Sequence, residues 1–203
     1  MLPMLLGVII AVLASGAAVS ALGYYVPFMV LGTVLMSVGA GLLSTISPTT
    51  SNAMLIVYPA VFGAGIGISF QQPIIAAQTV LSEEDIPIGT SVIVFGQSIG
   101  GAIILSVAET VFSNRLATNI RDMLGVAVSS EALLAGGIKD VVAAVLAAGG
   151  SLASLVDAEN KAITQAFYVG LAMAGLSIIG ALCVEWKSVK KEEERRKLMA
   201  AEA

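Results

Sequence analysis

An apolar segment that carries a proline and a glutamine pair constrains this chain more than any other. It covers residues 63–78 and reads GAGIGISFQQPIIAAQ. Proline has no N–H and clashes with the carbonyl four residues earlier, so Pro73 deprives the Ser69 carbonyl of its helical partner. The hydrocarbon of a membrane cannot satisfy that carbonyl, and irregular backbone there is tolerated only where protein covers it or a wet cavity adjoins it. The segment therefore predicts a helix kinked at Pro73 and surrounded by other helices.

The composition places that helix in a membrane. Of the 203 residues, 57% are hydrophobic and 12% are charged, whereas a soluble domain carries about 25% charged residues. The basic residues gather in residues 187–197, interleaved with glutamates, which argues against nucleic-acid binding. The chain has no histidine and one cysteine, Cys183. A His/Cys metal site and an internal disulfide are therefore excluded, and no cofactor is expected.

Five apolar runs are long enough to cross a membrane, which takes about 20 residues of helix. They cover residues 2–22, 26–46, 53–81, 88–112 and 164–184. The first run also resembles a signal peptide, but it has no basic residues before its apolar core, so we interpret it as a membrane helix with cleavage as the alternative. We expect an all-α membrane protein with an incomplete transmembrane bundle over residues 1–186.

Two polar segments lie outside these runs. Residues 113–163 form a long insert, in which helical spacing of apolar residues predicts a short amphipathic helix over residues 138–146. We favour a helix that lies on the mouth of the bundle over one that inserts into the membrane. Residues 187–203 form a charged tail. Glutamate and basic residues four positions apart in this tail predict a solvated helix that continues the last span, without a binding role.

The basic tail also predicts the topology. Lysine and arginine near the ends of spans favour the cytoplasmic side, so the tail is expected there. With five spans, the N-terminus and the insert then lie outside, and the acidic turn at residues 82–87 lies inside. We expect an integral, multi-pass protein of the plasma membrane, with the lipid bilayer as its surroundings.

Glutamines inside the spans are the candidate substrate-pathway residues: Gln71, Gln72 and Gln97. A glutamine in hydrocarbon seeks a hydrogen bond, either with a neighbouring helix or with water and substrate. The purely structural alternative stays open for all three. No nucleophile and base stand together in the spans, so an enzyme is not expected.

Glycines at spacings of four residues give two helices small, smooth faces. Gly63 and Gly67 lie on the third run, and Gly96, Gly100 and Gly101 lie on the fourth. Small residues let helix backbones approach closely in lipid. The pattern predicts helix packing at these positions, with the third and fourth helices packing closely on one another.

Three long segments carry a family resemblance. They are LPMLLGVIIAVLASGAAVSALGYYVPFMVLG, GAGIGISFQQPIIAAQTVLSEEDIPIGTSVIVFGQSIGGAIILSVAETVF and AFYVGLAMAGLSIIGALCVEWKSVK. Together they resemble the C-terminal part of a major facilitator superfamily transporter, in the branch of fungal fourteen-helix drug:proton antiporters that includes toxin-efflux pumps. The resemblance is weakest across the insert. It implies that the five runs correspond to the last five helices and form most of the C-terminal half-bundle.

The resemblance also implies a function and its limits. It implies a fragment of a secondary active transporter for proton-coupled efflux of drugs or toxins, with a small-molecule substrate once the missing half completes it. The family's antiporter motif and acidic proton carrier lie in that missing half, so the chain alone is not expected to be competent. The family usually has a basic residue near Ala21 or Tyr24, and this sequence has none. The alternative is a non-transporting membrane protein that associates with helices of other transporters through its glycine faces.

Overall fold

The computed structural model describes residues 2–47, 49–125, 142–143, 145–147 and 151–202. Its named elements are all helices: α1 (Leu2–Leu22), α2 (Val26–Leu43), α3 (Asn52–Phe70), α4 (Gln72–Val80), α5 (Ile86–Leu124), α7 (Leu152–Cys183) and α8 (Val189–Glu202). Within the described residues, five spans are long and apolar enough to cross a membrane, with α3 and α4 together forming one of them. The prediction of an all-α, multi-pass membrane protein is confirmed.

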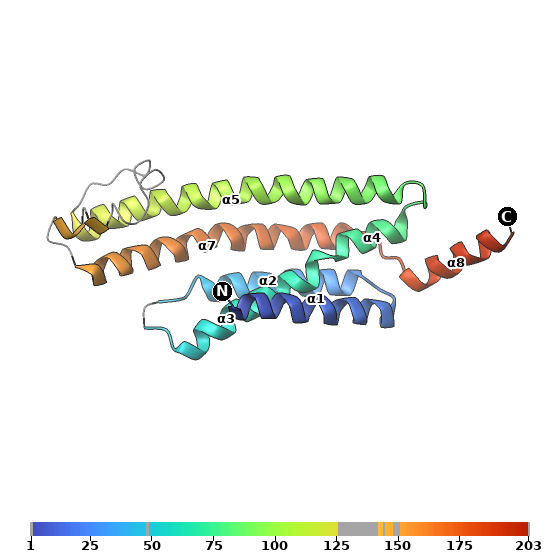
Figure 1. Cartoon of the computed structure of the whole chain (residues 1–203), viewed down its shortest axis with the longest axis horizontal. Coiled ribbons are helices and arrows are strands. Elements are labelled where there is room, and N and C mark those ends of the chain that lie inside the picture. The colour runs from blue at the N-terminus through green and yellow to red at the C-terminus, as the bar shows by residue number, and fades with distance from the viewer. Residues whose placement is uncertain (1, 48, 126–141, 144, 148–150, 203) are drawn as a thin grey trace.

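The spans run alongside one another as a bundle (Figure 1). α3 packs against both α1 and α2, α2 also packs against α7, and α7 packs against α5. The α1–α2 turn, the α4–α5 turn and α8 lie at one end of the bundle, which we call the tail end. The α2–α3 loop, the last turns of α5 and the first turns of α7 lie at the other end, which we call the insert end.

Two helices extend well beyond the spans that the sequence predicted. α5 has 39 residues and runs to Leu124 rather than 112, and α7 begins at Leu152 rather than 164. At 1.5 Å per residue α5 is about 58 Å long, whereas the hydrocarbon of a bilayer is about 30 Å thick. The predicted insert therefore begins and ends as helix. Gly125, with φ of 68°, ends α5, and the Ser151 hydroxyl caps α7 by accepting the Ser154 N–H.

These extensions of α5 and α7 pack on each other at the insert end. Together with Val145, which lies between them in the sequence, they form an apolar cluster made of Leu116, Ile120, Val145, Leu155, Ala158 and Ala162. The Asn119 amide donates to the Ala158 carbonyl at 3.2 Å across the same contact. Of the predicted amphipathic helix, residues 142–143 and 145–146 are helical, and residues 138–141 and 144 lie outside the described residues.

Glycines bring α3 close to two neighbours at once. A Cβ atom added at Gly63 would overlap the Met4 carbonyl of α1, and one at Gly67 would overlap the Val8 carbonyl. On another side of α3, a Cβ atom at Gly65 would overlap the backbone of Met36 in α2. These contacts need the absence of a side chain, because the backbones themselves touch.

The three glycines predicted to form the packing face of α5 do not take part in such a contact. A Cβ atom added at Gly96, Gly100 or Gly101 would have no atom within 4 Å among the described residues. None of the residues in the most apolar window of α5 is buried. This differs from the prediction that the glycine faces of the third and fourth helices meet, because α3 places its glycines against α1 and α2 instead.

The tail also differs from its prediction. α7 ends at Cys183, the chain from residues 184 to 188 is not helical, and α8 starts anew at Val189. The tail is therefore a separate helix rather than a continuation of the last span.

Replacing Gly67 by alanine should destabilise the bundle, because the new methyl group must displace the α1 backbone. We expect Gly67→Ala to lower the free energy of unfolding by about 1–3 kcal/mol, the usual range for overpacking. Gly100→Ala is the matched control, since space around Gly100 is open. Unfolding titrations in mixed micelles would measure both, and equal stability of the two variants would contradict the packing described for α3.

Candidate functional site

The break between α3 and α4 lies at Gln71, between two helical segments of one span. Pro73 is in the first turn of α4, a position where proline costs little because the N–H there has no helical partner. The Gln71 N–H turns back to the Ser69 carbonyl, which is the carbonyl that Pro73 leaves without a helical donor. The kink predicted from the sequence is thus present as a full interruption of the helix.

Two of the predicted glutamines supply donors to neighbouring carbonyls at this break. The Gln72 amide donates to the Ile68 carbonyl at 2.8 Å. The Gln97 amide of α5 reaches across to the Phe70 carbonyl at 3.4 Å, a long and weak hydrogen bond. Each carbonyl from Ile68 to Phe70 therefore has a donor nearby. This is what a membrane interior demands of an interrupted helix.

The three glutamines differ in exposure. Gln72 is fully buried, and its Oε1 has no hydrogen-bond partner among the described residues. Gln97 is half-buried, and Gln71 is exposed on the surface of the bundle. An unpaired buried acceptor costs about 1–3 kcal/mol, so the Gln72 oxygen is a place where a water or a ligand donor would be favourable.

A cavity of about 800 Å³ adjoins the break on a side that none of the three glutamines lines. It is bounded by α2, α3, α4, α5 and α7, and its walls are mostly apolar. Its lining residues are Met29, Thr33, Met36, Ser69, Pro73, Ala76, Ala77, Val80, Leu81, Gly89, Val92, Ile93, Ser177, Gly180, Ala181, Val184 and Glu185. Apolar cavities of this size with a few polar groups are typical of small-molecule sites.

The hydroxyl groups in this cavity all use their protons within their own helices. Thr33 donates to the Val30 carbonyl at 2.9 Å, Ser69 to the Gly65 carbonyl at 3.0 Å, and Ser177 to the Ala174 carbonyl at 2.6 Å. Their oxygen lone pairs remain as acceptors. The cavity therefore suits an apolar molecule that carries hydrogen-bond donors.

Sequence reasoning found the proline that lines this cavity but not the hydroxyls around it. Serine and threonine recur throughout the spans, and most bond to a carbonyl of their own helix. Only the packing of four spans distinguishes Thr33, Ser69 and Ser177 from the others. Within the described residues, no group of three or more histidine, cysteine, aspartate or glutamate side chains could hold a metal ion.

A charge at Gln72 should be far more disruptive than one at its neighbour. Gln72→Glu would bury a carboxyl beside the Ile68 carbonyl with no donor to replace the lost amide. We expect a loss of several kcal/mol, typical of an unpaired buried charge. Gln71→Glu is the control, because Gln71 is exposed. Thermal unfolding in detergent near pH 7 would compare them, and equal losses would contradict the different burial of the two side chains.

Comparison with known proteins gives close relatives over most of the chain. It is 44% identical over 191 residues, 93% of its length, to the MFS-type transporter astH of Aspergillus oryzae. It is 42% identical over 189 residues to the Aspyridones efflux protein of Neocamarosporium betae, and 40% identical over 190 residues to the efflux pump roqT of Penicillium rubens. The chain covers 33%, 33% and 35% of these proteins, so it spans about a third of the relatives it matches. No family model and no solved structure matches it.

Proposed function

We infer that this chain is one part of a secondary active transporter that exports small molecules. Most of its length is similar to about a third of the length of each of several fungal MFS-type transporters and efflux pumps. The relatives' names support efflux, and we propose drugs or toxins as the exported molecules. The observation that carries the proposal is the cavity beside the interrupted α3–α4 span, because broken helices in transporters mark binding sites near the middle of the membrane. Proton coupling and a location in the plasma membrane belong to the same proposal.

The cavity suggests the chemistry of the substrate. Its walls are apolar, and the hydroxyl oxygens of Thr33, Ser69 and Ser177 are left as acceptors. We therefore propose that it takes largely apolar molecules bearing N–H or O–H groups. Such molecules would reach it through the bilayer or from the tail end, where Glu185 lies at its edge.

The glutamines at the break form the second part of the proposed pathway. Gln71 is exposed beside the Phe70 carbonyl, and Gln97 approaches that carbonyl from α5. A substrate or water that passes along this surface would meet the Gln71 side chain. It would also meet those donors and acceptors of the Gln97 amide that do not bond to the Phe70 carbonyl. Gln72 would contribute from inside the bundle, through its Oε1, which has no hydrogen-bond partner in the described part of the chain.

A chimera tests the export proposal directly. The matching third of the Aspyridones efflux protein would be replaced by this chain, and export of aspyridones from fungal cells would be measured. We expect the chimera to export them, and the chain alone in proteoliposomes with an imposed proton gradient not to. A chimera that reaches the membrane intact but exports nothing, or a chain that transports by itself, would overturn the proposal.

A second function is favoured by one observation, the open glycine face of α5. In the described part of the chain nothing lies within 4 Å of a Cβ atom added at Gly96, Gly100 or Gly101, and small residues in a membrane helix mark sites of close helix contact. The chain would then be a non-transporting protein that associates with helices of other transporters. Crosslinking in membranes would separate the two functions. Gly100→Leu is the disruptive variant, and Gly7→Leu, at a position packed on the Ala60 backbone of α3, is the variant that only destabilises the bundle. A chain that crosslinks to no other protein would exclude this second function.

A further inference from the structure

The tail helix α8 begins against the turn between α1 and α2. The Val189 N–H donates to the Gly23 carbonyl at 2.8 Å, and Tyr24 pairs with Ser188 in an antiparallel bridge. Gly23 has φ of 77°, a conformation that glycine adopts readily. The backbone therefore fixes where α8 starts, more than 160 residues along the chain from the turn that it contacts.

Two cations of α8 then reach the C-terminal ends of other helices. Lys190 donates to the Ala21 carbonyl in the last turn of α1. Arg196 donates to the Gln78 carbonyl at 2.9 Å and to the Leu81 carbonyl at 2.6 Å, at the end of α4. The last carbonyls of a helix have no helical donor and carry partial negative charge, so a cation there is favourable. Neither α1 nor α4 has a basic residue in its own last turn.

A third contact ties the end of α7 to the same region. The hydroxyl of Tyr25, a fully buried side chain, donates to the Glu185 carbonyl. Burial raises the pKa of the Tyr25 phenol; a hydrogen bond with the backbone of Lys187 opposes this, and the negative charge of Glu185 adds to it, so that the pKa is raised overall. The phenol therefore keeps its proton, and so its donor, throughout the physiological range of pH.

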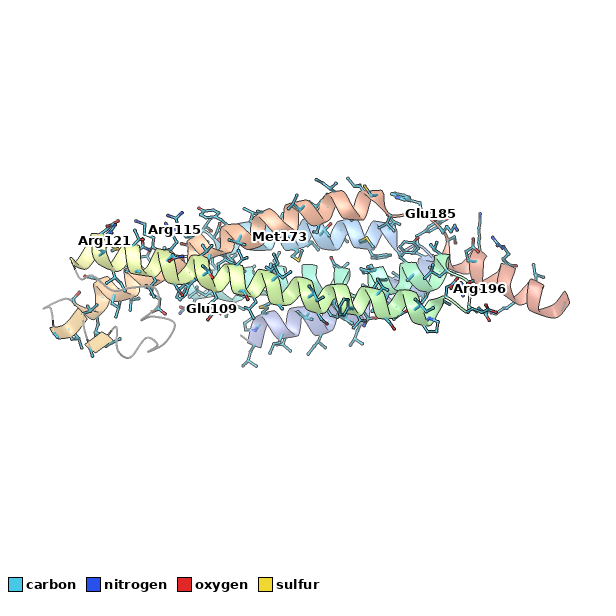
Figure 2. All side chains as sticks on the ribbon, turned by 90° about the horizontal axis from the view of Figure 1, so that it is seen from above. Glu109, Arg115, Arg121, Met173, Glu185 and Arg196 are labelled. Atoms are coloured by element: carbon cyan, nitrogen blue, oxygen red, sulfur yellow. The ribbon has the colours of Figure 1, made fainter. Side chains whose placement is uncertain are left out.

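Two of these contacts end at residues that line the cavity. Leu81, whose carbonyl accepts from Arg196, and Glu185, whose carbonyl accepts from Tyr25, both line it. Figure 2 shows Glu185 and Arg196 together at the tail end, away from Arg115 and Arg121 at the insert end. The position of α8 and the shape of the tail-end edge of the cavity are thus linked by hydrogen bonds.

We propose that α8 is a strap that narrows the tail-end edge of the cavity: Arg196 holds the C-terminal end of α4 in place, and Lys190 anchors the start of α8 on the end of α1. Release of the strap frees the end of α4 and widens access to the cavity from the tail side. The proposal rests on the proposed function only in treating the cavity as a substrate site. The strap itself requires no transport.

Access to the cavity can be measured without a substrate. The full chain, with Cys183→Ser to remove the native thiol and Ser177→Cys to place one in the cavity, would be reconstituted in vesicles. A membrane-impermeant maleimide would be added on the tail side, and the rate of labelling recorded. Arg196→Gln should raise that rate about fivefold to tenfold, as expected for the loss of charge-assisted hydrogen bonds.

The neighbouring residues of α8 provide matched controls. Arg195→Gln removes the same charge, but Arg195 pairs with Glu192 of its own helix at 3.5 Å and is largely exposed, so labelling should not change. Lys190→Gln and Lys191→Gln form a second, independent pair. Only Lys190 donates to the Ala21 carbonyl at the end of α1, so only Lys190→Gln should speed labelling. Arg196→Lys keeps a cation and should give a rate between those of the parent and Arg196→Gln.

The outcomes separate the strap from the export proposal. Equal labelling rates for Arg196→Gln and Arg195→Gln, together with equal rates for the lysine pair, would overturn the strap even if the chimera exports aspyridones. Faster labelling in Arg196→Gln would support the strap even if export fails. Should Arg196→Gln prove unfolded on size-exclusion chromatography, the lysine pair decides the outcome alone.

Discussion

Every backbone carbonyl in the hydrocarbon of a membrane needs a donor, and this requirement organises the centre of the bundle. The interruption at Gln71 would leave carbonyls exposed, and the donors come from the Gln71 N–H and from the side chains of Gln72 and Gln97. The Gln97 amide comes from a different span, so α5 contributes a donor to the break, through a long and weak hydrogen bond. The same requirement applies at the tail end, where cations of α8 cap helices that lack basic residues of their own.

Much of the fold follows from the sequence, because length and hydropathy define membrane spans. The limits of α1 agree with the predicted run, and the kink at Pro73 is a property of proline itself. The extensions of α5 and α7 escaped prediction because hydropathy detects only residues that lipid surrounds. The residue types at their ends were local signals in the sequence nonetheless: a glycine, Gly125, which ends α5 in a left-handed conformation, and a serine, Ser151, which caps α7.

The contacts between helices were harder to predict than the helices. Glycine spacing showed that Gly63 and Gly67 belong to a close-packing face, but not that α1 would occupy it. Nor does the sequence show that the cavity would form without the glutamines in its lining, or that Lys190 and Arg196 would fold back onto α1 and α4. These depend on the relative position of segments distant in the chain, which periodicity within one helix does not encode.

The length of α5 has a mechanical consequence. A helix of 39 residues without an interruption is a stiff rod of about 58 Å, packed on α7 from the insert end into the membrane. If such a rod tilts by about 5° around one end, the other end moves by about 5 Å, which is comparable to one helical turn. A small tilt of α5 and α7 at the insert end would therefore move the tail end of α5 by several ångströms, because α5 has no hinge between its two ends.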